Sequence, residues 1–206
     1  MASILCSCTM GFTVIASEHQ ENNFLYEISV IDNATNQEVE IEVISEEIVP
    51  LISQQSQNVE EQKVEYDVIF LLPVNNNEKT RSSISSEQEK ASIHAKVTLT
   101  YSISSDQNYI KVSKISGFWE CIDENYSMTF SDREVMVTDG LPLNTGKVIY
   151  EYPTTNSFSY DTGWGYVQYY PNNVDAMSGA RGYSEATGSI DGMGGSYTIF
   201  TFVAVP

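Results

Sequence analysis

The segment at residues 93–103 alternates apolar and polar residues without interruption. Successive side chains of a β-strand point to opposite faces, so this alternation predicts a strand with one buried and one solvated face. Shorter runs of the same kind recur along the chain and indicate an all-β protein. We predict further strands at residues 24–31, 39–43, 64–72, 109–112, 126–130, 148–152, 158–160, 165–170 and 197–205.

Three local patterns refine this prediction. The apolar phase slips between Val112 and Ile115, which predicts a bulge that absorbs one extra residue. Residues 197–205 are apolar on both faces, which is typical of a strand in the middle of a sheet. The glycine-rich stretches at residues 179–182 and 192–195 are interpreted as turns, and the second would close a hairpin before the last strand.

The spacing of the strands after residue 90, about ten residues, is typical of an antiparallel β-sandwich of the immunoglobulin-like or jelly-roll-like kind. Residues 75–90 are polar and nearly free of large apolar side chains, which indicates a linker. We therefore expect an acidic β-rich segment at residues 17–74 and a sandwich domain at residues 91–206. The alternative is that residues 75–90 form a long loop within one sandwich.

The start of the sequence suggests export. Residues 4–16 carry no charge, and a polar, acidic stretch that contains His19 follows at once. Thirteen residues are too few for a membrane-spanning helix, but they fit the apolar part of a secretory signal. We interpret residues 1–16 as a signal-peptide remnant, with a first core strand as the alternative. A lipid anchor at Cys8 is a minority hypothesis, because the apolar run continues past that residue.

The net charge of the chain limits the classes of partner that it is expected to bind. The chain has 28 acidic and 10 basic residues and a net charge of −18, so it repels phosphate backbones and anionic lipid heads. We expect no nucleic-acid partner and no membrane insertion after signal cleavage. The expected location is extracellular or at the cell surface.

Few residues in the sequence indicate a catalytic or metal-binding site. His94 would sit on the polar face of its strand, and Cys121 lies among apolar residues, so neither indicates a nucleophilic site. No spacing suggests a metal centre. We predict no cofactor; calcium at Asp123, Glu124 and Asn125, with Asp132 nearby, is the alternative, although no defined loop motif supports it. The lack of a catalytic motif favours a protein that is not an enzyme but leaves that question open. A hydrolase that uses Glu120, Asp123 or Glu124 as paired carboxylates remains an alternative.

Aromatic residues are concentrated in one segment, well above the 11% average of the chain. Tyrosine and tryptophan combine a flat apolar face with a polar tip, which suits sugar rings and protein surfaces, although aromatic residues are also common in ordinary strands. Trp164, flanked by glycines, is expected to be exposed. The aromatic residues are Tyr150, Tyr152, Phe158, Tyr160, Trp164, Tyr166, Tyr169 and Tyr170, and the candidates for binding a glycan or a surface protein are Trp164, Tyr160, Tyr166, Tyr169 and Tyr170.

Two segments carry a resemblance. Residues 115–119 (ISGFW) and 156–163 (NSFSYDTG) resemble stretches in uncharacterised exported proteins of Gram-positive bacteria. The resemblance implies an exported all-β protein and implies no particular activity. The hypothesis is therefore an exported binding module for a carbohydrate or protein ligand. The alternatives are an extracellular hydrolase, or a structural or secreted effector protein without a small-molecule ligand.

Overall fold

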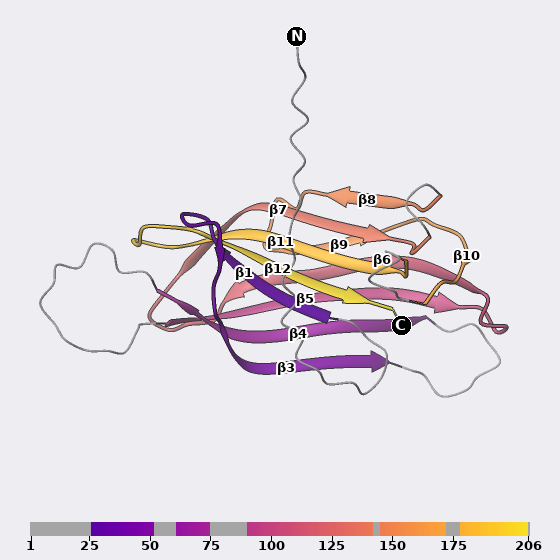
Figure 1. The fold of residues 1–206 in the computed structure, drawn as a ribbon, viewed down its shortest axis with the longest axis horizontal. Coiled ribbons are helices and arrows are strands. Elements are labelled where there is room, and N and C mark those ends of the chain that lie inside the picture. The colour runs from indigo at the N-terminus through magenta and orange to yellow at the C-terminus, as the bar shows by residue number, and fades with distance from the viewer. Residues whose placement is uncertain (1–25, 52–60, 75–89, 142–144, 172–177, 206) are drawn as a thin grey trace, which may run out of the picture.

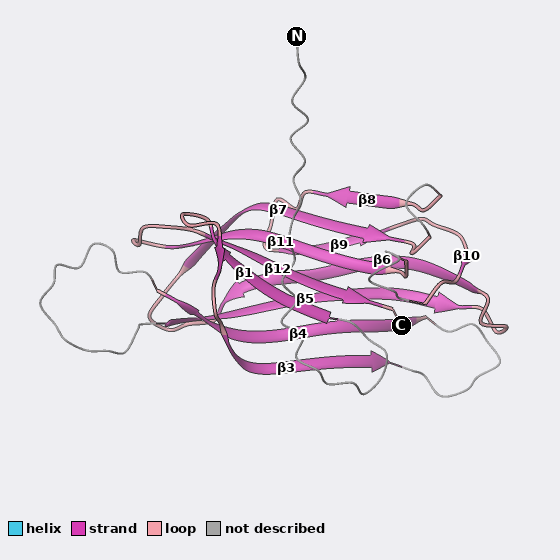
Figure 2. Ribbon diagram, viewed as in Figure 1, coloured by secondary structure: helices cyan, strands magenta, loops and turns pink. Residues whose placement is uncertain are grey.

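The computed structural model describes residues 26–51, 61–74, 90–141, 145–171 and 178–205, apart from the side chains of residues 49–51. These residues form two antiparallel sheets packed against each other, with no helix among them (Figures 1 and 2). The prediction of an all-β sandwich is confirmed. The strands are β1 (Tyr26–Asp32), β2 (Gln37–Glu38), β3 (Glu42–Leu51), β4 (Gln62–Pro73), β5 (Lys90–Ile103), β6 (Tyr109–Cys121), β7 (Met128–Thr138), β8 (Val148–Glu151), β9 (Ser157–Asp161), β10 (Val167–Gln168), β11 (Arg181–Ile190) and β12 (Tyr197–Ala204).

We call the two sheets A and B. Sheet A has the order β2-β1-β12-β11-β7-β8. Sheet B has the order β10-β6-β5-β4-β3, and β9 also pairs with β6. The central strands β11 and β12 of sheet A pack over β4, β5 and β6 of sheet B (Figure 1).

The core lies between the sheets and consists of the inward side chains of each strand. On β5, Ile93, Val97 and Leu99 are completely buried, and on β12 Ile199 and Val203 are too. On β6, the indole of Trp119 is fully buried and its ring centroid lies 5.1 Å from that of Phe158. The removal of this apolar area from water is the main term that stabilises the sandwich.

Several details expected from the sequence are confirmed. The strand at residues 93–103 lies within β5. The bulge occurs where Thr100 pairs with Lys114 and Tyr101 with Val112, which leaves Ser113 as the extra residue. β12 lies in the middle of sheet A between β1 and β11, and the glycine-rich loop before it closes the β11–β12 hairpin. In that loop Gly192 and Gly195 adopt positive φ, the conformation that glycine allows at little cost.

Two predictions are wrong. Val39 and Ile41 do not belong to a continuous strand, because β2 ends at Glu38 and β3 begins at Glu42. Residues 179–182 are not a simple turn, because β11 already begins at Arg181. Gly182 lies inside β11, where a Cβ atom would come within 2.9 Å of Ile115 Cδ1 in sheet B. The glycine therefore serves close packing of the two sheets.

Strands before and after the expected linker belong to the same sheets. β4 pairs with β5 from Gln62↔Tyr101 to Pro73↔Lys90, and β1 pairs with β12. The strands of residues 26–74 and of residues 90–205 thus share one core. The signal-like residues 1–16, Cys8, His19 and most of the polar segment at residues 75–90 lie outside the described residues. In the described part of the chain there is no helix long and apolar enough to span a membrane.

Candidate binding surface

The structure divides the predicted aromatic cluster between the core and the surface. Tyr160 on β9 is half-buried and stacks against the buried Phe158, with ring centroids 6.3 Å apart. Trp164 lies on the loop after β9, as expected, but its side chain is half-buried and packs against the core. Tyr166 on the same loop is 45% exposed. The expectation that Trp164 is the exposed member is therefore wrong.

The two remaining candidates follow β10. Tyr169 and Tyr170 are half-buried, and the Tyr169 backbone N–H donates to the Asn108 carbonyl oxygen at 2.8 Å. Burial raises the pKa of Tyr101 to about 12, and the nearby phenol of Tyr169 adds to the effect. Tyr169 thus contributes to the core near Tyr101. The five candidate residues do not form one exposed platform, because most of them help to close the edge of the sandwich beside β6.

A different set of aromatic side chains gathers on the outer face of sheet A. The inward residues of β12 are Ile199, Thr201 and Val203, so Phe200 and Phe202 point outward. The register places Phe202 beside Tyr183, Tyr183 beside Met136, and Met136 beside Tyr150, in one row across β12, β11, β7 and β8. We call these residues, together with Phe200 and Val148, the aromatic face.

The aromatic face is packed at one end and open at the other. The Tyr183 ring centroid lies 4.9 Å from that of Phe202 and 5.6 Å from that of Phe200. On the edge strand β8, Tyr150 is 54% and Val148 42% exposed. Tyr183 and Met136 are half-buried. Sheet A is thus apolar on both faces along this row, whereas one face of an antiparallel sheet normally stays polar in water.

Carboxylates border the aromatic face. Glu185 neighbours Phe200 on one side and Glu134 on the other, while Glu27 neighbours Phe202. Partial burial raises the pKa of Glu185, and the charge of Glu134 adds to it. Burial also raises the pKa of Glu27, with Glu38 as the second cause. Glu185 and Glu27 each lie close to a like charge, and Glu185 still reaches the solvent with part of its side chain.

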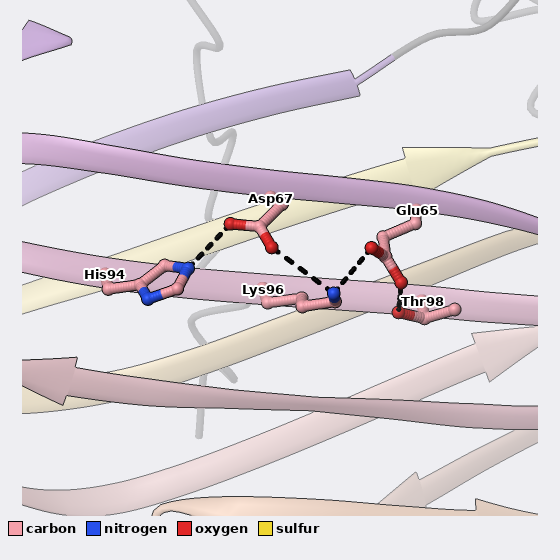
Figure 3. A network of polar contacts seen from close by, with 5 residues as sticks. All are labelled: Glu65, Asp67, His94, Lys96 and Thr98. Atoms are coloured by element: carbon pink, nitrogen blue, oxygen red, sulfur yellow. Dashed lines mark hydrogen bonds and ion pairs between the residues drawn. The ribbon is translucent and has the colours of Figure 1, made fainter. Parts of the chain in front are cut away.

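The outer face of sheet B has the opposite character. His94 Nε2 lies 2.6 Å from Asp67 Oδ1, and Lys96 Nζ lies 2.5 Å from Glu65 Oε1 and 3.2 Å from Asp67 Oδ2 (Figure 3). Thr98 Oγ1 donates to Glu65 Oε2 at 2.9 Å. Burial acts against the charged form of Lys96, but Glu65 and Asp67 outweigh it and raise its pKa. Both carboxylates thus contact Lys96, and each has a second polar partner in the network, His94 for Asp67 and Thr98 for Glu65.

This network contains His94, the histidine that the sequence analysis considered for a nucleophilic site. The prediction that His94 lies on the polar face of its strand is confirmed, and the edge of the Phe118 ring packs against the imidazole with centroids 4.7 Å apart. The hydroxyl in the network, that of Thr98, donates to Glu65 and not to His94. A nucleophile activated by His94 is therefore not part of this network.

Two other chemical candidates, Cys121 and Asp123, have structural partners, whereas Glu120 and Glu124 are exposed. Cys121 Sγ lies 3.4 Å from the Tyr126 carbonyl oxygen, and burial raises its pKa, which disfavours the thiolate. Asp123 accepts the backbone N–H groups of Asn125 at 2.8 Å and of Ser92 at 3.0 Å, and the Asn125 bond is the first cause that lowers its pKa. A carboxyl group that stays ionised in this way is a poor general acid.

A hollow of about 650 Å³ lies elsewhere, near the β1–β2 turn and the end of β4. Lys90 Nζ bonds to Glu42 Oε2 across 2.6 Å, and the Tyr197 hydroxyl donates to the Pro73 carbonyl oxygen at 2.9 Å. Its polar groups thus partly satisfy each other. The lining residues are Asp32, Val39, Glu40, Ile41, Glu42, Leu71, Pro73, Lys90 and Tyr197. None of the sequence-predicted site residues is among them.

Within the described ranges, no three His, Cys, Asp or Glu side chains are grouped so that they could hold a metal ion.

Sequence reasoning missed the aromatic face because its residues come from four strands that only the register brings together. The one signal was the apolar character of both faces at residues 197–205, whose outward members are Phe200 and Phe202.

The comparisons with known proteins found no similar protein. No family model matches the chain, and no curated protein or solved structure was found to be similar to it.

Proposed function

We propose that this chain is an exported or cell-surface interaction module that binds a segment of another protein on the aromatic face of sheet A. The observation that carries the proposal is the row Phe202, Tyr183, Met136 and Tyr150, which lies on the outer side of a sheet whose inner face already forms the core. Tyr150 is the exposed end of this row, whereas Phe202 at the other end is only 9% exposed. Surfaces of this kind are typical of protein–protein contacts, in which Tyr, Phe and Met are enriched.

The position of β8 supports a protein ligand. Among the described strands, β8 is the last of sheet A, so its outer backbone groups have no partner strand in the described part of the chain. Its outward residues Val148 and Tyr150 are the most exposed members of the aromatic face. A segment that crosses the aromatic face and reaches this edge would cover these two side chains.

Selection of peptides from a random display library, with the full chain as bait, tests the proposal. We expect the selected peptides to bind Tyr150→Ser at least about tenfold more weakly than the wild type, because loss of an aromatic hot-spot contact costs about 2 kcal/mol or more. Tyr109→Ser is the matched control, since Tyr109 is 48% exposed but lies on β6 of sheet B. Circular dichroism and thermal unfolding of both variants verify the fold.

Two results would contradict the proposal. Selected peptides that bind both variants as well as the wild type would place recognition elsewhere. A glycan array that yields a ligand whose binding depends on Tyr166, together with a failed peptide selection, would favour the carbohydrate alternative.

A further inference from the structure

We propose that the partner segment on the aromatic face is cationic, with Lys or Arg side chains that seat on Glu185, Glu134 and Glu27 while its apolar residues cover the rings. This inference rests on the proposed function and names the chemistry of the partner. It deals with one class of ligand, a basic amphipathic protein segment.

The first argument is the arrangement of charge on the outer face of sheet A. Glu185 and Glu134 are direct cross-strand neighbours on β11 and β7. Like charges directly opposite each other destabilise a sheet, so this pair is unfavourable in the isolated chain. A bound ammonium or guanidinium group between the two carboxylates would remove that repulsion.

The second argument is the contrast with sheet B. There Glu65 and Asp67 are each within 3.2 Å of Lys96, so the chain pairs these acids internally. On the aromatic face, the described ion pairs include none with Glu27, Glu134 or Glu185. The outward basic residue of β11, Arg181, lies at the far end of the strand, where its Nη2 donates to the Ser178 carbonyl oxygen.

The third argument excludes a second copy of the chain as the occupant. The net charge of −18 opposes self-association. A symmetric contact through the aromatic face would also place Glu27, Glu134 and Glu185 of one copy close to the same three residues of the other copy. A basic partner is instead attracted from a distance and is complementary on contact. Complementary charge also favours one orientation of the segment across the row of rings.

The test uses three labelled model peptides of equal length. The first alternates Lys with Leu and Trp, the second has Glu in place of every Lys, and the third has the lysines of the first but Ser in place of its apolar residues. Binding to the full chain is measured by fluorescence anisotropy at low and at physiological salt. We expect the first peptide to bind at least about tenfold more tightly than either of the others.

The variants test whether the basic peptide binds at Glu134 and Glu185 or is attracted only by the overall negative charge of the chain. The double variant Glu134→Gln/Glu185→Gln should weaken binding of the basic amphipathic peptide about tenfold. Glu120→Gln/Glu124→Gln is the matched control, because it removes the same charge from exposed positions that are not part of the strands of sheet A, and it should change binding less than about twofold. Tyr150→Ser should weaken binding without changing the slope of affinity against salt.

The outcomes distinguish this inference from the proposed function. If Tyr150→Ser weakens binding but the acidic peptide binds as well as the basic one, the aromatic face binds protein and the cationic partner is refuted. If both double variants weaken binding equally, the attraction is non-specific and the inference is also refuted. If no variant and no peptide charge matters, both proposals fail.

Discussion

The hydroxyl oxygens of Ser184 and Thr201 lie 2.6 Å apart at a position between the sheets where neither residue is exposed. The two residues are direct cross-strand partners on β11 and β12. A buried hydroxyl must find a partner or lose the hydrogen bonds that water gave it. Here one hydroxyl donates to the other, and the Thr201 hydroxyl also lies 3.5 Å from the Ser184 carbonyl oxygen, so the two polar groups are satisfied within the two central strands of sheet A.

The first prediction concerns this pair. Ser184→Ala should lower the free energy of unfolding by about 1–3 kcal/mol, because it leaves the Thr201 hydroxyl without its closest partner. The double variant Ser184→Ala/Thr201→Val should recover most of the loss, since both polar groups are then removed together. Urea unfolding of the two single variants and the double variant checks this. A double variant that loses the sum of both single effects would show that the pair is not coupled.

The second prediction concerns Gly117 on β6. A Cβ atom there would lie 2.1 Å from the Lys96 carbonyl oxygen and 2.7 Å from Phe158 Cζ, so neither backbone nor ring leaves room for it. Gly117→Ala should therefore destabilise the fold by about 3 kcal/mol, the upper end of the usual cost of overpacking. Thermal unfolding measures the change. Gly194→Ala is the control, because no atom lies within 4 Å of its Cβ position, and it should leave the melting temperature nearly unchanged.

The third prediction is a pH dependence at the aromatic face. Since partial burial and Glu134 raise the pKa of Glu185 in the folded state, its contribution to stability is complete below the unfolded value and is lost as the pH rises through the folded value. Glu185→Gln should therefore be more stable than the wild type at neutral pH. The gain should not exceed about 0.5 kcal/mol, because the side chain is partly exposed and screened.

Unfolding in urea at neutral pH and at about pH 4 measures the size of this gain, which should disappear at the lower pH because Glu185 is then largely protonated. The same change at the exposed Glu124 serves as the comparison. A gain that persists unchanged at low pH would contradict the assigned cause.

The fourth prediction concerns the polar network on sheet B. Asp67→Asn removes the charge that faces both His94 and Lys96, so it should lower the free energy of unfolding by about 1 kcal/mol. The side chains of the pair are about three-quarters buried, so high salt should reduce the effect only in part. Denaturant unfolding at low and high salt checks both statements. An effect that vanishes completely in salt would mean that the pair behaves as an exposed one.

Much of the fold was predictable because strands with large inward residues carry a clear period of two. β5 and β4 follow this rule with Val, Ile, Leu and Phe at inward positions. β11 was missed for a physical reason: its inward positions are Gly182, Ser184, Ala186 and Gly188, which look like turn residues in the sequence. They are small because large side chains of other strands occupy the space, as Ile115 does at Gly182 and Met128 at Gly188.

The candidate site was less predictable than the fold. A cluster of aromatic residues in the sequence was a poor guide to a binding surface, since Phe158 and Tyr160 on β9 and Tyr169 after β10 pack against the core. The aromatic face depends on which strands are neighbours in sheet A, and a single strand pattern does not contain that information. Outward residues of β12, β11, β7 and β8 meet only through the register.

The pairing of β1 with β12 has a consequence for how the molecule is made. Tyr26 meets Val203, so sheet A joins segments from the two extremes of the described chain. A nascent polypeptide can assemble the β3–β6 meander early, but β1 must wait for its neighbour until β12 has been synthesised. Closing so long a loop slows folding, and during that interval the unpaired edge of β1 is open to association with the wrong chain.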